Sequence, residues 1–181
     1  MAIIPDDKDW TWVLERACPE CGFESSALPR DQIAPMIRTN AQAWVDILAG
    51  EPDQLRLRVR ADRWSPLEYA CHVRDVFRTF DDRLTLMLTQ DNPLYQNWDQ
   101  DRTAVEDHYE DQDPTPVAAE LCEAADTLAG HFGRVEGAAW ARRGTRSDEA
   151  SFTVESLGRY MVHDVLHHLE DVTGDLAAPF A

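Results

Sequence analysis

The chain has 181 residues, 44% of them hydrophobic, and its 34 Asp and Glu against 17 Lys and Arg give a formal net charge of −17. This length suits one substantial core, so we expect a single domain, and the negative field disfavours nucleic acids and anionic lipid surfaces as partners. The sequence has no apolar run of membrane-spanning length, no secretory signal and only one close pair among its four cysteines, so we expect a cytoplasmic protein.

The N-terminal segment, residues 1–28, is expected to be short and irregular, ahead of a helical domain over residues 29–181. Its main feature is the turn Cys18-Pro19-Glu20-Cys21-Gly22, which resembles half of a zinc ribbon. A Cys-x-x-Cys turn holds a metal only when two further ligands arrive, and the sequence has no second cysteine pair. We therefore expect a plain turn first, with a metal site or a redox dithiol as the alternatives.

Two stretches show the alternation of apolar and polar residues that is typical of extended strands. The first covers Trp10, Trp12 and Leu14, and the second covers Leu55, Leu57 and Val59. Either these stretches pair as two short strands, or both lie across the helical domain with their apolar side inward.

Two amphipathic helices are predicted in the first half of the chain. The first spans Asp31 to Ala49 and stops before Gly50. The second runs from Pro66 to about Leu88, because Ser65 supplies an N-cap, Pro66 suits the first helical position and Glu68 completes a capping box.

The second half of the chain predicts two more helices after a long acidic connection over residues 89–114. Thr115-Pro116 repeats the cap-plus-proline signal, and this helix runs to about Glu136, ahead of Gly137. The fourth helix runs from Val154 to Thr173, between the cap Thr153 and the stop Gly174. Four amphipathic helices joined by loops, two of them long, predict an all-α four-helix bundle.

The segment Val162–Val172, VHDVLHHLEDV, packs three histidines and several carboxylates into about three helical turns. Imidazole and carboxylate are the usual ligands of Zn²⁺ and its first-row neighbours, and a spacing of four puts two of them on one helix face. The pair is either His163 with His167 or Asp164 with His168. His72, on the second predicted helix, is the candidate for a third ligand.

The sequence RWSPLEYACHVRD at residues 63–75, followed by HDVLHHLEDV at residues 163–172, resembles the DinB/YfiT-like family. The resemblance spans the four predicted helices. It implies a bundle that carries a divalent metal, held by one His on the second helix and two groups four residues apart on the last. The family is also similar to the N-terminal domain of mycothiol-dependent maleylpyruvate isomerase and to bacterial low-molecular-weight thiol transferases.

A helical wheel at about 100° per residue distinguishes the two pairs on the last helix. The apolar face contains Val154, Leu157, Met161, Val165, Leu169 and Val172. His168 lies within this face and Asp164 at its edge, whereas His163 and His167 point nearly opposite its centre. The resemblance agrees, because it aligns the family's doubled His with residues 167 and 168 and puts Asp164 where relatives carry His or Glu. We therefore favour His72, Asp164 and His168 as the metal ligands.

Three protein ligands leave a coordination position open, where Zn²⁺ or Ni²⁺ binds water or a thiolate and lowers its pKa by several units. The resemblance implies a metal-dependent thiol S-transferase that moves a small thiol such as mycothiol onto a small-molecule electrophile. Water is the alternative nucleophile. The competing hypothesis is a non-catalytic metal-binding bundle whose exposed apolar surface mediates homodimer formation.

Overall fold

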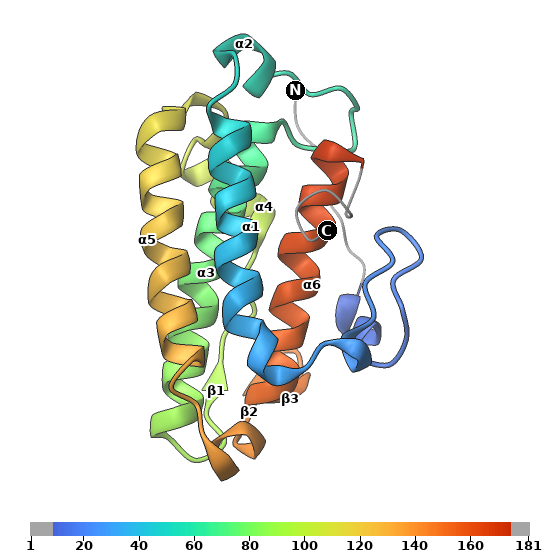
Figure 1. Ribbon diagram of the computed structural model, residues 1–181, viewed down its shortest axis with the longest axis vertical. Coiled ribbons are helices and arrows are strands. Elements are labelled where there is room, and N and C mark those ends of the chain that lie inside the picture. Colours follow the sequence, from blue (N-terminus) through green and yellow to red (C-terminus); the bar gives the residue numbers. More distant parts are fainter. Residues whose placement is uncertain (1–8, 175–181) are drawn as a thin grey trace.

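Four long helices form the body of the computed structural model, which describes residues 9–174 (Figure 1). They are α1 (Ile33–Leu48), α3 (Pro66–Thr89), α5 (Pro114–Phe132) and α6 (Val154–Thr173). The predicted all-α four-helix bundle is therefore confirmed. No helix of the described part is long and apolar enough to cross a membrane.

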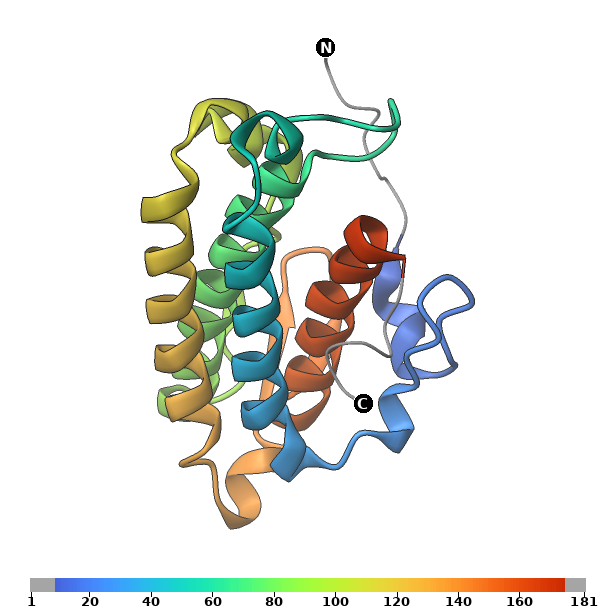
Figure 2. The same ribbon diagram turned by 45° about the horizontal axis from the view of Figure 1, so that its top comes forward.

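The four helices form an arrangement in which α1 contacts α5 and α6, and α3 contacts the same two helices. α1 and α6 run in one direction, and α3 and α5 run in the other (Figures 1 and 2). The connections from α1 to α3 and from α5 to α6 therefore join helices that are not close neighbours in the bundle. This topology places the start of α3 beside the end of α6, where Arg63 pairs with Asp171.

The sequence signals at the ends of α3 and α6 act as predicted. Ser65 and Glu68 form a capping box at the start of α3, and Thr153 forms one with Ser156 at the start of α6. Gly174 ends α6 with a φ of 66°, in the left-handed region that favours glycine. α6 has the predicted bounds, and α3 ends one residue later than predicted.

The predicted bounds of the third helix were wrong at both ends. α5 starts at Pro114, because the carboxylate of Asp113, not the hydroxyl of Thr115, caps it by accepting the Thr115 backbone N–H. It ends at Phe132, where Gly133 follows, and not near Glu136. The predicted long connection before it contains the short helix α4 (Gln100–Glu106) and a 3-10 turn at Tyr109–Asp111.

Of the two alternatives for residues 10–14 and 55–59, the paired strands are wrong. Residues Trp10–Leu14 form a 3-10 helix that Asp9 caps, and Leu55 ends the short helix α2 (Pro52–Leu55). These local caps and turns satisfy backbone groups that a strand would have paired. The small sheet lies instead at one end of the bundle, where β1 (Leu94–Tyr95) pairs in parallel with β2 (Arg143–Arg146), which pairs antiparallel with β3 (Ser151–Thr153).

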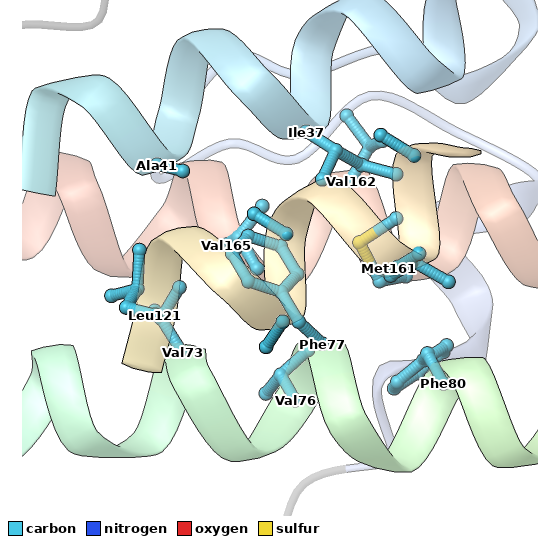
Figure 3. Packing of buried hydrophobic residues seen from close by; sticks show 14 of the residues in the cluster. Ile37, Ala41, Val73, Val76, Phe77, Phe80, Leu121, Met161, Val162 and Val165 are labelled. Atoms are coloured by element: carbon cyan, nitrogen blue, oxygen red, sulfur yellow. The ribbon is translucent and has the colours of Figure 1, made fainter. Parts of the chain in front are cut away.

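All four long helices contribute side chains to one core. Figure 3 shows Ile37 of α1, Phe77 of α3, Leu121 of α5 and Val165 of α6 gathered in the same region. Each of these side chains is no more than 1% exposed. Such complete burial makes the core the main source of stability and fixes α3 against α6, on which the candidate site depends.

Gly158 lies where α6 packs tightly against Ile33 and Phe132. A Cβ atom at this position would lie 2.8 Å from Ile33 Cδ1 and 2.9 Å from Phe132 Cε1. We expect Gly158→Ala to lower the free energy of unfolding by about 1–3 kcal/mol through overpacking, measured by denaturant titration. Gly130→Ala is the control, because its added Cβ would meet only Arg134 Nη1 at 3.6 Å and the helix should become slightly more stable. Equal effects of both substitutions would contradict this prediction.

Candidate metal centre

His72 of α3 meets Asp164 and His168 of α6 between the two helices. Their potential ligand atoms all lie within 4.8 Å of one another. His72 Nε2 is 3.4 Å from Asp164 Oδ1, and His168 Nε2 is 3.6 Å from the same oxygen. The structure thus brings the favoured set of three residues into one place, which we call the α3–α6 centre.

Two donor atoms of this centre, His72 Nε2 and Asp164 Oδ1, face each other at 3.4 Å. His72 Nε2 and Asp164 Oδ1 form no hydrogen bond with any described residue, although both atoms are buried. Burial lowers the pKa of His72, and although burial raises the pKa of Asp164, the neighbouring imidazoles lower it to about 2. A neutral imidazole and an ionised carboxylate are the protonation states that metal coordination requires. The 3.4 Å contact between these two buried atoms is too long for a good hydrogen bond, and a shared cation would satisfy both of them.

Aromatic rings hold the two imidazoles of the α3–α6 centre. The Trp98 ring stacks on His72 with centroids 5.2 Å apart and an interplanar angle of 3°. Trp64 contacts the same imidazole at 5.1 Å, and Tyr69 lies 4.9 Å from His168. These contacts restrict rotation of the rings and exclude water from His72, whose side chain is 0% exposed.

Asp171 lies behind His168, on the side of the imidazole that faces away from Asp164. Its Oδ2 lies 3.6 Å from His168 Nδ1 and accepts a hydrogen bond of 3.0 Å from the Tyr69 hydroxyl, while Oδ1 pairs with Arg63. A carboxylate behind a ligand imidazole orients the ring and favours the tautomer whose other nitrogen faces the metal. Asp171 is therefore placed to direct His168 Nε2 toward Asp164.

The alternative pair, His163 and His167, lies on a different side of α6. Among the described residues these two imidazoles group with Cys18 and Cys21, and not with His72. They point away from the apolar face of α6, as expected, but they are only 3% and 7% exposed. They are buried because residues 10–27 of the N-terminal segment cover this side of α6 (Figure 2).

Comparisons with known proteins agree with this architecture. The family model of the DinB superfamily matches residues 36–172. No curated protein matches the chain.

Two solved structures share the fold. One is YfiT from Bacillus subtilis, a probable metal-dependent hydrolase with an unusual four-helix bundle topology. It is similar with a TM-score of 0.73 and 20% identity over 82% of this chain and 86% of that one. The other is the mycothiol-dependent maleylpyruvate isomerase, with a TM-score of 0.65 and 12% identity over 86% of this chain and 67% of that one.

Proposed function

Because the chain belongs to the DinB superfamily, we propose that it is a metal-dependent enzyme whose divalent ion, zinc or nickel, is held by His72, Asp164 and His168. The observation that carries the proposal is the convergence of these three donors from two helices, with His72 Nε2 and Asp164 Oδ1 buried and lacking hydrogen bonds among the described residues. Two imidazoles and one carboxylate suit zinc and nickel better than magnesium or calcium, which prefer oxygen ligands alone. When bound, the ion lowers the pKa of a water or thiol ligand by several units.

The residues around the centre have different roles. His72 is a rigid donor at the inner side, enclosed by Trp64 and Trp98. The side chains of Asp164 and His168 are 24% and 16% exposed, so a substrate approaches from their side. Asp171 keeps His168 oriented, and its own charge is balanced by Arg63. The inner side of the site is closed, and the partly exposed side chains lie on the side from which we propose that the substrate enters.

We propose transfer of a low-molecular-weight thiol such as mycothiol to a small electrophile as the reaction. The similarity in fold to the mycothiol-dependent isomerase supports a thiol as the nucleophile. Hydrolysis, with water as the nucleophile, is the second candidate, because the higher TM-score belongs to the probable metal-dependent hydrolase YfiT. Both reactions need the same three ligands and differ in what approaches beside Asp164 and His168.

The test is to measure turnover with zinc-loaded or nickel-loaded protein. Mycothiol and a bimane electrophile report thiol transfer through thioether formation, and a panel of esters and amides reports hydrolysis. We expect thioether formation to fall to the uncatalysed rate when the metal is chelated and to return when it is added back. Metal-dependent hydrolysis without thiol transfer would favour the second candidate. Activity that is unchanged after the metal is removed would overturn the proposal.

A further inference from the structure

Four metal-binding side chains meet on the side of α6 that faces the N-terminal segment. They are Cys18, Cys21, His163 and His167, which we call the cysteine–histidine cluster. Their potential ligand atoms all lie within 4.8 Å of one another, and all four residues are buried, with exposed fractions of 1%, 6%, 3% and 7%. Neither cysteine forms a disulfide. The two further ligands that the Cys-x-x-Cys turn lacked in the sequence are therefore supplied by α6.

Local backbone structure places the two thiols together. The Cys18 N–H donates to the Phe23 carbonyl at 2.8 Å, and the Gly22 N–H donates to the Cys18 carbonyl at 2.8 Å. Gly22 adopts a φ of 74°, which closes this tight turn at little cost because glycine has no Cβ. On α6, residues 163 and 167 are four apart and share one face. The resulting Cys-x₂-Cys and His-x₃-His spacings are those of structural zinc sites.

The two imidazoles of the cluster are prepared for coordination. His163 Nε2 is buried and has no hydrogen-bond partner among residues 9–174. His167 Nδ1 lies 3.8 Å from Cys18 Sγ, while its Nε2 faces Glu20 at 3.7 Å and Asp171 at 4.0 Å. A carboxylate on the far nitrogen is the usual outer partner of a ligand histidine.

An aromatic cover shields the cluster from solvent. The Trp10 ring contacts His163 at 5.5 Å and His167 at 4.9 Å, and Phe23 contacts His163 at 5.8 Å. Burying four polar groups costs free energy unless they are paired, and thiols and imidazoles add little apolar packing to offset that cost. A bound cation would provide the missing partner.

We propose that the cysteine–histidine cluster binds one zinc ion in a closed, four-ligand structural site that joins the N-terminal segment to α6. Soft thiolate and imidazole donors select zinc over magnesium or calcium. Binding converts two thiols into two thiolates and releases two protons to solvent, with no change in oxidation state. This site is distinct from the α3–α6 centre, because the ligands differ and four protein donors leave no position for a substrate.

The experiment uses the full chain loaded with cobalt in place of zinc. Cobalt bound by cysteine shows a thiolate-to-metal charge-transfer band in the near ultraviolet, which imidazole and carboxylate ligands do not produce. We expect this band in the wild-type protein, its loss in the double variant Cys18→Ser/Cys21→Ser, and its retention in His72→Ala. In the zinc-loaded proteins, mass spectrometric metal analysis should show one equivalent of zinc per chain less in the double variant than in the wild type.

Cys122→Ser is the control, since this partly exposed thiol lies on α5 outside the cluster. It should keep both the charge-transfer band and the metal content of the wild type. Absence of the band from reduced wild-type protein would overturn the proposal without reference to any variant. A zinc content that the double variant retains in full, or a Cys18–Cys21 disulfide in protein purified under zinc and reductant, would overturn it as well. Failure of the α3–α6 centre would appear separately, as unchanged metal content in His72→Ala.

Discussion

His72→Ala and His168→Ala are each expected to lose the metal of the α3–α6 centre together with all metal-dependent turnover. Each substitution removes one of three protein ligands. Loss of a residue that only hydrogen-bonds a metal ligand typically weakens metal affinity about 10–100-fold, so loss of a ligand itself should weaken the affinity further. Metal analysis should show one equivalent less per chain, and calorimetric titration of the metal-free protein should show the weaker binding.

The controls for this prediction come from the other histidines of the chain. His108→Asn replaces an exposed residue in a left-handed backbone conformation that asparagine tolerates, so metal content and activity should not change. His163→Ala should keep the metal-dependent turnover of the α3–α6 centre, because His163 groups with Cys18 and Cys21, although its metal content should fall through loss of the zinc proposed for that cluster. Full metal content and activity in both His72→Ala and His168→Ala would remove these residues from the site. Loss of activity in His163→Ala, with activity retained in Cys18→Ser/Cys21→Ser, would instead support the pair that we did not favour.

Phe77→Ala is expected to cause the largest loss of stability of any single change considered, about 3–5 kcal/mol in the free energy of unfolding. The Phe77 side chain is 0% exposed and lies among residues of all four long helices (Figure 3), so its removal leaves a cavity that no neighbour fills completely. Because domains are stable by only about 5–15 kcal/mol, this variant should show a much lower urea midpoint.

Val59→Ala is the matched control for the core prediction. Val59 is 78% exposed, and its truncation should change the free energy of unfolding by no more than about 0.5 kcal/mol. A loss below about 1 kcal/mol in Phe77→Ala would mean that the core around α3 and α6 is not packed as the structure shows it.

The helices of the bundle could be predicted from the sequence where local signals agreed with the apolar pattern. At Ser65 and Thr153, a cap and a periodic apolar face coincided, and both helix starts were correct. At Thr115, a second cap candidate two residues earlier was overlooked, since Asp113 also precedes a proline. The structure of residues 10–14 could not be predicted, because alternation over five residues does not distinguish a strand from a 3-10 turn that a neighbouring side chain caps.

The meeting of His72, Asp164 and His168 could be predicted because all three lie on regular helices whose buried faces are visible in the sequence, and because the family resemblance indicated the same residues. The aromatic enclosure of this centre could not, since Trp98 reaches His72 from an irregular connection. The cysteine–histidine cluster was missed for a related reason. Its two halves are separated by more than 140 residues, and one half belongs to a segment without periodicity. The available signal was the matched pair of spacings, Cys-x-x-Cys and His-x-x-x-His.

Asp171 connects the two groups of histidines on α6. Its carboxylate lies 4.0 Å from His167 Nε2 and 3.6 Å from His168 Nδ1, and so contacts both the cysteine–histidine cluster and the α3–α6 centre. Substitution at this one position would therefore disturb the surroundings of both histidines together. Relatives that lack Cys18 and Cys21 but have His72 and His168 should therefore still have an acidic residue at position 171. Relatives that lack His72 and His168 should have this acidic residue only if both cysteines are present.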